Sequence, residues 1–170
     1  MPWTFIRDRA GTMQRVDTMG EITIQKVTPD APEELFAAMS QLDMLCFSDA
    51  GWSPQDFMDE AAMESGIVLA AYCGKELAGL LAGFTASDTG EILTVATTPK
   101  YRRKGIARKL MEVFFSYVPE GTESIALEVR QSNTAAAALY KSFGFEKVGV
   151  RRRFYREPVE DADIMVKRLV

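Results

Sequence analysis

The chain has 170 residues, of which 47% are hydrophobic and 26% charged, a composition typical of one globular domain. No apolar run is long enough to cross a bilayer, and charged residues interrupt the start of the chain too often for a signal peptide. We therefore expect a cytoplasmic protein, without membrane contact, in which residues 1–20 are a poorly ordered extension and residues 21–170 form a single domain.

Strand-like and helix-like patterns alternate along the chain without a linker or an internal repeat. Alternating or continuous apolar residues predict strands over residues 21–27, 67–73, 77–86, 91–97, 124–129, 145–155 and 162–168. Helical spacing and capping residues predict helices over 31–47, 53–63 and 133–143, and a further helix whose apolar face begins at Ile106. This order predicts an α/β fold with a mixed sheet and helices on its faces.

The sequence contains no histidine, which limits the chemistry available to it. A Ser-His or Cys-His nucleophilic site is excluded, and the commonest zinc ligand is missing. Cys46 and Cys73 are far apart and form neither a disulfide framework nor a metal-ligand cluster. We expect no metal, and acid–base chemistry carried by Glu, Asp, Tyr, Lys or Cys.

The net charge of −4 conceals opposite charges in the two parts of the chain. Residues 1–98 carry 5 basic and 15 acidic side chains, whereas residues 99–170 carry 15 basic and 9 acidic ones. Half of the 20 basic residues lie in KYRRKGIARK, from Lys100, and RRRFYR, from Arg151. The C-terminal part suits an anionic ligand, although charge alone would favour a solvated face.

A glycine, Gly105, interrupts the first basic stretch where the third helix begins. A helix N-terminus offers free N–H groups and the positive end of the helix dipole, so a strand, a short turn and a helix can bind an anion. Glycine allows the anion to approach the backbone, and the small side chain of Ala107 does not obstruct it. Positive charge around the site comes from Arg102, Arg103, Lys104 and Arg108. For the isolated motif RRKGIA, a simple turn with solvated arginines is about equally favoured.

The run VATTPKYRRKGIARKLM resembles the coenzyme-binding signature of the GNAT superfamily of N-acetyltransferases. The similarity continues through ALEVRQSNTAAAALYKSFGFEKVGVRRRFY and DADIMVKRL and reaches back to CFSDAGWSPQDF, so that it covers about residues 21–169. The chain resembles the bacterial RimI type, which acetylates ribosomal-protein alanine. It implies a mostly antiparallel twisted sheet that splays at the acetyl-CoA site. Two positions depart from the pattern: Ala107 replaces a second glycine, and Thr98 an often acidic residue.

The resemblance also implies which residues bind acetyl-CoA. In the family, the R/Q-x-x-G-x-G/A turn holds the pyrophosphate, and the strand before it leaves backbone groups free for the pantetheine arm. The corresponding residues in this chain are Val95, Ala96, Thr97, Arg102, Arg103, Lys104, Gly105, Ile106, Ala107, Arg108 and, further along the coenzyme, Asn133.

Glu128 and Tyr140 are the candidate catalytic residues. The resemblance implies that Glu128 accepts a proton from the amine and that Tyr140, beside the coenzyme sulfur, protonates the departing thiolate. Glu128 lies in an apolar strand, where partial desolvation would raise its pKa toward a useful range. From the residues alone, Glu128 could be a surface carboxylate paired with Arg130, and Tyr140 an ordinary core aromatic.

The acceptor amine is the least determined part of the prediction. The acidic N-terminal part suits a basic protein terminus, and the RimI-like resemblance implies a protein N-terminus, most specifically the N-terminal alanine of a ribosomal small-subunit protein. In that family the segments containing Trp52, Phe154 and Tyr155 flank the acceptor groove, but packing on the sheet explains these aromatics equally well.

Three other functions are compatible with parts of the sequence. A small amine, such as a polyamine or an antibiotic, could be the acceptor. A non-catalytic acyl-CoA-binding module would need the loop around Gly105 but not Glu128 and Tyr140, so their joint presence favours an enzyme. Direct nucleic-acid binding through RRRFYR is disfavoured by an isoelectric point near 5.0.

Overall fold

The structure is a computed structural model that describes residues 4–7, 13–16 and 22–170. Within the expected N-terminal extension it describes two short strands, β1 (Thr4–Arg7) and β2 (Met13–Val16). The other residues of the segment 1–20 lie outside the described ranges, so the expectation of poor order there stays a prediction.

From residue 22 onward, the elements follow the order predicted from the sequence. The strands are β3 (Ile22–Lys26), β4 (Gly66–Cys73), β5 (Glu76–Ala86), β6 (Thr89–Thr97), β7 (Ser124–Arg130), β8 (Glu146–Arg156) and β9 (Val159–Arg168). The helices are α1 (Glu33–Phe47), α2 (Pro54–Ala62), α3 (Ile106–Tyr117) and α4 (Thr134–Ser142), with 3-10 turns at Ser48–Ala50 and Pro99–Tyr101. The main difference is that β9 begins before residue 162, because Val159 and Glu160 pair with Arg156 and Tyr155 of β8.

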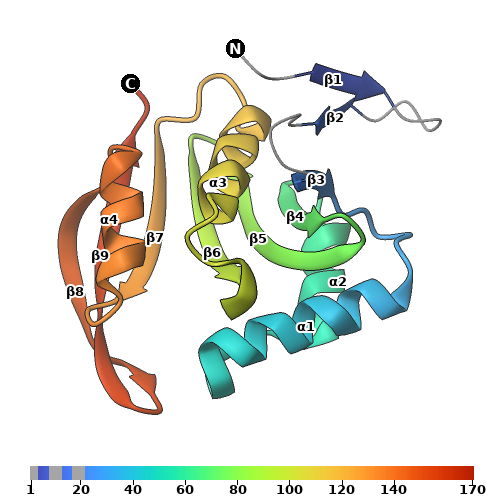
Figure 1. The fold of residues 1–170 in the computed structure, drawn as a ribbon. Helices are drawn as coiled ribbons and strands as arrows, with labels where there is room; N and C mark the ends of the chain where they lie inside the picture. The colour runs from blue at the N-terminus through green and yellow to red at the C-terminus, as the bar shows by residue number, and fades with distance from the viewer. Residues whose placement is uncertain (1–3, 8–12, 17–21) are drawn as a thin grey trace.

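The described strands form one sheet in the order β1-β2-β3-β4-β5-β6-β7-β9-β8 (Figure 1). Neighbouring strands run antiparallel except β6 and β7, which are parallel and are joined through α3. The predicted mixed, mostly antiparallel sheet is therefore confirmed. Because the chain crosses from one half-sheet to the other between β6 and β7, this junction is a natural place for a ligand site.

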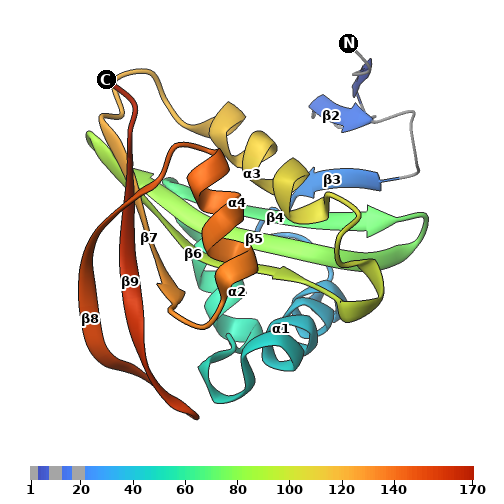
Figure 2. The same ribbon diagram turned by 60° about the vertical axis from the view of Figure 1, so that its left-hand side comes forward.

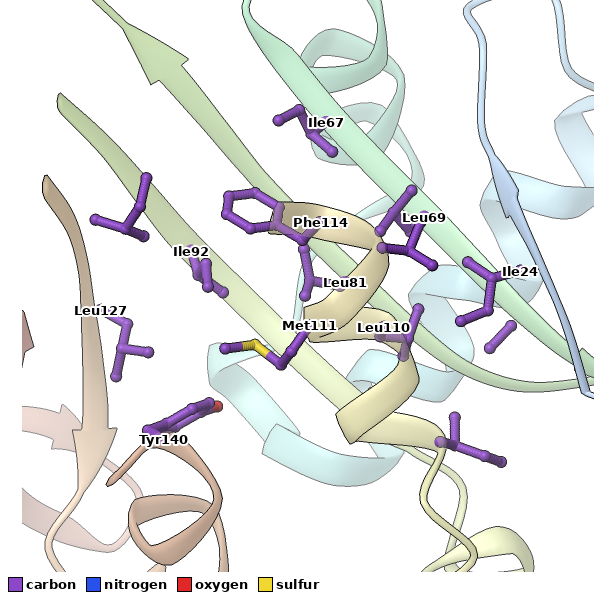
Figure 3. Close-up of a cluster of buried hydrophobic side chains, with 14 of the residues drawn as sticks. Ile24, Ile67, Leu69, Leu81, Ile92, Leu110, Met111, Phe114, Leu127 and Tyr140 are labelled. Carbon is purple, nitrogen blue, oxygen red and sulfur yellow. The ribbon is translucent and has the colours of Figure 1, made fainter. Parts of the chain in front are cut away.

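Helices cover both faces of the sheet, as Figure 2 shows. On one face, α3 and α4 bury a core that includes Leu110 and Phe114 of α3, each fully buried (Figure 3). On the other face, α1 and α2 bury Phe36 and Phe57 against Val68 and its neighbours. Each such side chain contributes about 1.5–3 kcal/mol by its removal from water, so the two cores hold the sheet between two helical layers.

The start of α2 is fixed by a reciprocal capping box. The Ser53 Oγ accepts a hydrogen bond from the Asp56 N–H at 3.2 Å, and Asp56 accepts one from the Ser53 N–H at 2.7 Å. Pro54 occupies the first turn, where a missing N–H costs nothing. This cap determines where the chain enters α2, and therefore positions the preceding Trp52.

Among the helices that the structure describes, none is both long and apolar enough to span a membrane.

Candidate active site

The parallel strands β6 and β7 pair over a short stretch and then diverge. Their register joins Thr89–Ile92 to Ser124–Leu127 and goes no further. A β-bulge starts the divergence, because β5 pairs with the residues on either side of Leu93 and leaves Leu93 itself without a partner. The sheet is therefore open between the second half of β6 and the end of β7.

Free backbone groups of β6 face this opening. The Thr98 N–H donates to the Ala78 carbonyl of β5 at 3.0 Å. Since hydrogen-bonding direction alternates along an antiparallel strand, the polar backbone groups of Ala96 also point to β5, and those of Val95 and Thr97 point to the opening. Of the three residues expected to offer backbone groups, Val95 and the Thr97 N–H can do so; the Thr97 carbonyl already accepts hydrogen bonds from Arg102 and Cys46, and Ala96 points to β5.

The loop after β6 ends in a glycine with a left-handed backbone. Gly105 is the N-cap of α3 with φ of 80°, and a Cβ added there would meet open space. Glycine is therefore required for its conformation, not because neighbours crowd it. The first helical hydrogen bond runs from the Lys109 N–H to the Gly105 carbonyl at 3.0 Å. Within the described chain, the N–H groups of Ile106, Ala107 and Arg108 have no acceptor, so they can bind an anion.

Three basic side chains surround this loop. Arg102 donates from Nε to the Thr97 carbonyl at 3.4 Å, and its Nη2 lies 4.0 Å from the Cys46 Sγ. The Lys104 Nζ lies 5.1 Å from the centre of the Tyr101 ring, and Arg103 is exposed with φ of 63°. All three side chains are exposed and remain able to approach an anion at the loop.

Arg108 differs from the other basic residues of the motif. Its Nη2 donates to the Ser142 Oγ at 2.9 Å, and its guanidinium lies 5.2 Å from the centre of the Phe143 ring. Its side chain therefore connects α3 to α4. The sequence suggested that it would face the loop, and in the structure it does not. Its backbone N–H remains part of the anion site.

A cleft of about 500 Å³ lies where β6 and β7 separate. It is enclosed by these strands, by α4, by the segment between α1 and α2, and by the β8–β9 hairpin. Its lining residues are Phe47, Ala50, Trp52, Glu91, Ile92, Leu93, Thr94, Val95, Leu127, Glu128, Val129, Arg130, Asn133, Tyr140, Arg151, Phe154, Tyr155 and Arg156. The structure thus brings both candidate catalytic residues and all three candidate acceptor-groove aromatics into one cleft.

Glu128 projects into the cleft from β7, between the buried Leu127 and Val129. Burial raises the pKa of its carboxyl above the ordinary value, Arg151 lowers that pKa, and Glu91 raises it further. The Arg151 Nη1 lies 2.9 Å from the Glu128 Oε1. The partner considered from the sequence, Arg130, is paired with another carboxylate instead. A partly desolvated carboxylate with a raised pKa suits a general base.

Tyr140 reaches the cleft from α4 and is both a core residue and a cleft residue. Its side chain packs in the cluster shown in Figure 3, where its ring extends from α4 toward the gap between β7 and β6. Burial raises the pKa of its hydroxyl, so the phenol keeps its proton at neutral pH. Within the described chain this hydroxyl has no hydrogen-bond partner, so it is available to a ligand in the cleft.

Asn133 lines the cleft and is also the N-cap of α4. Its Oδ1 accepts a hydrogen bond from the Ala136 N–H at 3.2 Å. The capping bond fixes the side-chain oxygen, whereas the amide nitrogen is not engaged by it. If the cap stays intact, the predicted contact with the coenzyme can therefore be made only by the Asn133 amide nitrogen.

The three aromatics of the predicted acceptor groove are packed as well as exposed to the cleft. The Trp52 ring lies 5.1 Å from that of Phe57, which is part of the core under α2. Phe154 and Tyr155 meet edge to face at 5.0 Å, and the Arg130 guanidinium lies 3.9 Å from the Tyr155 ring centre. These contacts hold the rings in place at the edge of the cleft.

Sequence reasoning missed several cleft residues, above all Glu91, Leu93 and Arg151. Glu91 begins the predicted strand 91–97, but its position opposite β7 depends on a pairing between segments that are distant in the chain. Arg151 belongs to the basic run RRRFYR, but its ion pair with Glu128 depends on how β8 lies against β9. Within the described residues, no group of His, Cys, Asp and Glu is arranged to hold a metal ion.

The splayed sheet, the free N–H groups at the start of α3 and the cleft lined by Glu128 and Tyr140 are the arrangement expected of an acyltransferase that uses an acyl-coenzyme A. The family described as "Acetyltransferase (GNAT) family" matches residues 36–145, and the chain belongs to this family of N-acetyltransferases. Enzymes of this family use acetyl-CoA as the acetyl donor.

Relatives with defined names are similar over large parts of the chain. "N-alpha-acetyltransferase RimI" of Mycobacterium tuberculosis is 36% identical over 125 residues, which are 71% of this chain and 78% of that protein. "[Ribosomal protein bS18]-alanine N-acetyltransferase" of Escherichia coli K12 is 40% identical over 81 residues, or 46% of this chain and 55% of the relative.

A solved structure extends this similarity. The crystal structure of the ribosomal-protein-S18-alanine N-acetyltransferase from Escherichia coli superposes with a TM-score of 0.74 and 26% identity, covering 87% of this chain and 94% of that one. The GNAT fold and the RimI-like resemblance expected from the sequence are confirmed.

Proposed function

We propose that this enzyme acetylates the α-amino group of a protein N-terminus, most specifically the N-terminal alanine of a ribosomal small-subunit protein. The observation that carries the proposal is the single cleft in which Glu128 and Tyr140 lie beside the open edge of β6. Trp52 and the β8 residues Phe154 and Tyr155 line this cleft, where they would flank an extended terminus. The names of the M. tuberculosis and E. coli relatives support this acceptor.

Acetyl-CoA would lie along the free edge of β6. The pyrophosphate would be held by the N–H groups at the start of α3 and by the exposed Arg102, Arg103 and Lys104. Charge-assisted hydrogen bonds from these groups would stabilise its negative charge. The pantetheine arm would pair with the backbone of Val95 and Thr97, and the Asn133 amide nitrogen would contact the coenzyme further along. This arrangement leads the thioester to the point where β6 and β7 separate.

The chemistry would be direct transfer without a covalent enzyme intermediate. The Glu128 carboxylate removes one proton from the ammonium form of the acceptor and later releases it to solvent, and the neutral amine nitrogen attacks the thioester carbonyl carbon. A backbone N–H near Val95 would stabilise the oxyanion. When the carbon–sulfur bond breaks, the Tyr140 hydroxyl donates its proton to the coenzyme A thiolate. The phenol then recovers a proton that the new amide nitrogen loses.

Mass spectrometry of a ribosomal small-subunit protein beginning with alanine, incubated with enzyme and acetyl-CoA, tests the acceptor. We expect one acetyl group on the N-terminal alanine. Acetylation confined to lysines or to free amines would contradict the proposal. Because ribosomal proteins are made in the cytoplasm, we also propose that the enzyme acts there.

A small amine is a second candidate acceptor, favoured by the two carboxylates, Glu91 and Glu128, that line the cleft. Negative charge in a partly enclosed cleft attracts any compact cation. Comparing kcat/KM for polyamines with that for alanine-starting peptides separates the two functions. A preference for the peptide is the expected result.

A further inference from the structure

Glu91 is a cleft carboxylate to which the proposed mechanism gives no role. It lies on β6 two residues before the bulged Leu93, and its half-buried side chain lines the cleft. Within the described chain, its carboxylate makes no hydrogen bond and no ion pair. Holding a carboxylate partly out of water without a cation is unfavourable, so a cationic ligand would find a compensating partner here.

The sheet register places Glu91 and Glu128 on the same face. Glu91 lies opposite Ala126 in the parallel ladder, and Glu128 follows Ala126 by two residues on β7. Paired residues of neighbouring strands, and residues two apart on one strand, project to the same side. With strands about 4.8 Å apart and a two-residue rise of about 6.6 Å, the Cα atoms of the two glutamates lie roughly 8 Å apart. An ammonium group between them can reach both carboxylates.

The charges around this pair leave room for an incoming cation. The Arg151 side chain that pairs with Glu128 is 56% exposed, whereas the Glu128 side chain is 18% exposed. Arg151 can therefore move into solvent while Glu128 stays in the cleft. Arg130, a second cation of the cleft, is already held by Glu160 at 3.3 Å. The titratable and charged groups that line the cleft around Glu128 are Glu91 from β6, Arg130 from β7, Arg151, Tyr155 and Arg156 from β8, and Tyr140 from α4.

We infer that Glu91 and Glu128 together bind the ammonium form of the acceptor amine, Glu91 holding it by charge while Glu128 removes its proton. The inference rests on the proposed amine acetylation and adds a second carboxylate to it. An α-amino group with a pKa near 8 enters mostly protonated at neutral pH. It replaces the Arg151 guanidinium beside Glu128, loses one proton to that carboxylate, and then attacks the thioester as a neutral amine.

Binding measurements on two peptides test the pair without relying on turnover. One peptide begins with alanine, and the other carries a propionyl group in its place and lacks only the amine. At pH 7 we expect the wild-type enzyme to bind the alanine peptide more tightly. Glu91→Gln should raise the dissociation constant of the alanine peptide by roughly five- to tenfold and leave that of the propionyl peptide unchanged. Glu123→Gln, which removes an exposed carboxylate just before β7, is the matched control and should change neither affinity.

The pH profile of kcat/KM provides a readout that a merely structural role of Glu91 would not move. Removing the neighbouring negative charge lowers the pKa of Glu128, so the acidic limb of the profile should shift to lower pH in Glu91→Gln. Glu91→Asp keeps the charge and should keep the limb close to its wild-type position. If Glu91→Gln proves unstable, Glu91→Thr, which also removes the charge and suits a strand, is measured with the same two readouts.

The outcomes separate this inference from the proposed function. Unchanged affinity for the alanine peptide together with an unmoved acidic limb in Glu91→Gln would overturn the carboxylate pair, even if the peptide is acetylated normally. If the enzyme acetylates only small amines, the protein-acceptor proposal fails. The pair is then tested with that amine and its desamino analogue, and a selective loss in Glu91→Gln would still support it.

Discussion

Glu128 and Tyr140 have pKa values that burial raises in the same direction, yet their proposed roles need opposite protonation states. A phenol with a raised pKa keeps the proton that an acid must donate. A carboxyl whose pKa rises from its ordinary value comes closer to the pKa of the amine it must deprotonate. Desolvation of the cleft therefore suits both roles.

Removing either group should reduce turnover without preventing coenzyme binding. We expect Glu128→Gln and Tyr140→Phe each to lower kcat by roughly 10²- to 10³-fold, the usual contribution of a positioned acid or base. The dissociation constant of acetyl-CoA, measured by calorimetry, should stay near the wild-type value. Full activity in either variant would remove that residue from the proposed mechanism. A stable acetyl-cysteine adduct at Cys46 or Cys73 would instead indicate a covalent route.

At the scale of elements, the proposed anion site lies at the β6–α3 connection, where Gly105 adopts a left-handed conformation. A side chain at Gly105 would strain the backbone, because φ is 80° there. Its β-carbon would meet no atom within 4 Å and would occupy the open space beside the free N–H groups. Gly74, in the β4–β5 turn, has φ of 61° and equally open surroundings. It offers a matched position away from the cleft.

Gly105→Ala and Gly74→Ala should therefore have the same effect on stability and different effects on the KM for acetyl-CoA. Each should lower the free energy of unfolding by about 1–2 kcal/mol, the cost of a left-handed alanine. Gly105→Ala alone should raise the KM for acetyl-CoA, by roughly tenfold if the anion loses about 1.4 kcal/mol of binding. Urea unfolding and steady-state kinetics measure the two effects. An equal KM change in both variants would argue against a coenzyme site at this loop.

Asp43 joins three elements beside the cleft. It is a fully buried carboxylate on α1 that accepts hydrogen bonds from the Trp52 N–H at 2.8 Å and from the Thr94 hydroxyl at 2.7 Å. It therefore ties α1 to the segment before α2 and to β6, one residue beyond the bulge. Burial raises its pKa, and the two hydrogen bonds lower it by a smaller amount.

Asp43→Ala should destabilise the fold by roughly 2–4 kcal/mol, because it leaves two buried donors without an acceptor. The raised pKa means that the native state binds this proton more tightly than the unfolded chain. The stability from this proton is present below the unfolded pKa of 3.8 and is lost as pH rises through the folded pKa. The destabilisation should therefore be smaller at pH 7 than at pH 4. Asp59→Ala, at an exposed site on α2, should cost less than about 0.5 kcal/mol in the same urea titrations.

At the scale of the whole molecule, the site lies between two half-sheets. Strands β1 to β6 form one half and β7, β9 and β8 the other, joined through one short parallel ladder (Figure 1). A coenzyme held by β6, the start of α3 and the start of α4 would bridge these halves. Such a ligand binds the native state only, since its partners come from distant parts of the chain.

Acetyl-CoA should accordingly raise the melting temperature. At a hundred times its dissociation constant, a ligand that binds only the native state adds about 2.7 kcal/mol, which corresponds to roughly 5–10 °C for a chain of this size. Thermal-shift measurements with acetyl-CoA, and with adenosine as the control, check this. A shift with adenosine alone, or none with acetyl-CoA, would contradict a coenzyme held along the whole of β6.

The order of elements, the two-sided burial and the loop around Gly105 could be predicted from the sequence, because periodicity, capping and glycine placement are local properties of the chain. The resemblance to GNAT enzymes pointed to Glu128, Tyr140 and Asn133, which the fold brings to one cleft. The sequence did not indicate that Asn133 also caps α4, or that the Arg108 side chain would turn to Ser142. Both features depend on how α4 sits against its neighbours.

What the sequence determined by itself was the fold class, the position of the glycine-containing loop before α3, and the family to which the chain belongs. Only the tertiary structure decided that Ala96 points its backbone to β5, that Arg151 rather than Arg130 pairs with Glu128, and that Glu91 joins Glu128 on one face. These facts depend on strand register. Register is set by pairing between segments far apart in the chain, and a shift of one residue would turn every one of these side chains to the opposite face.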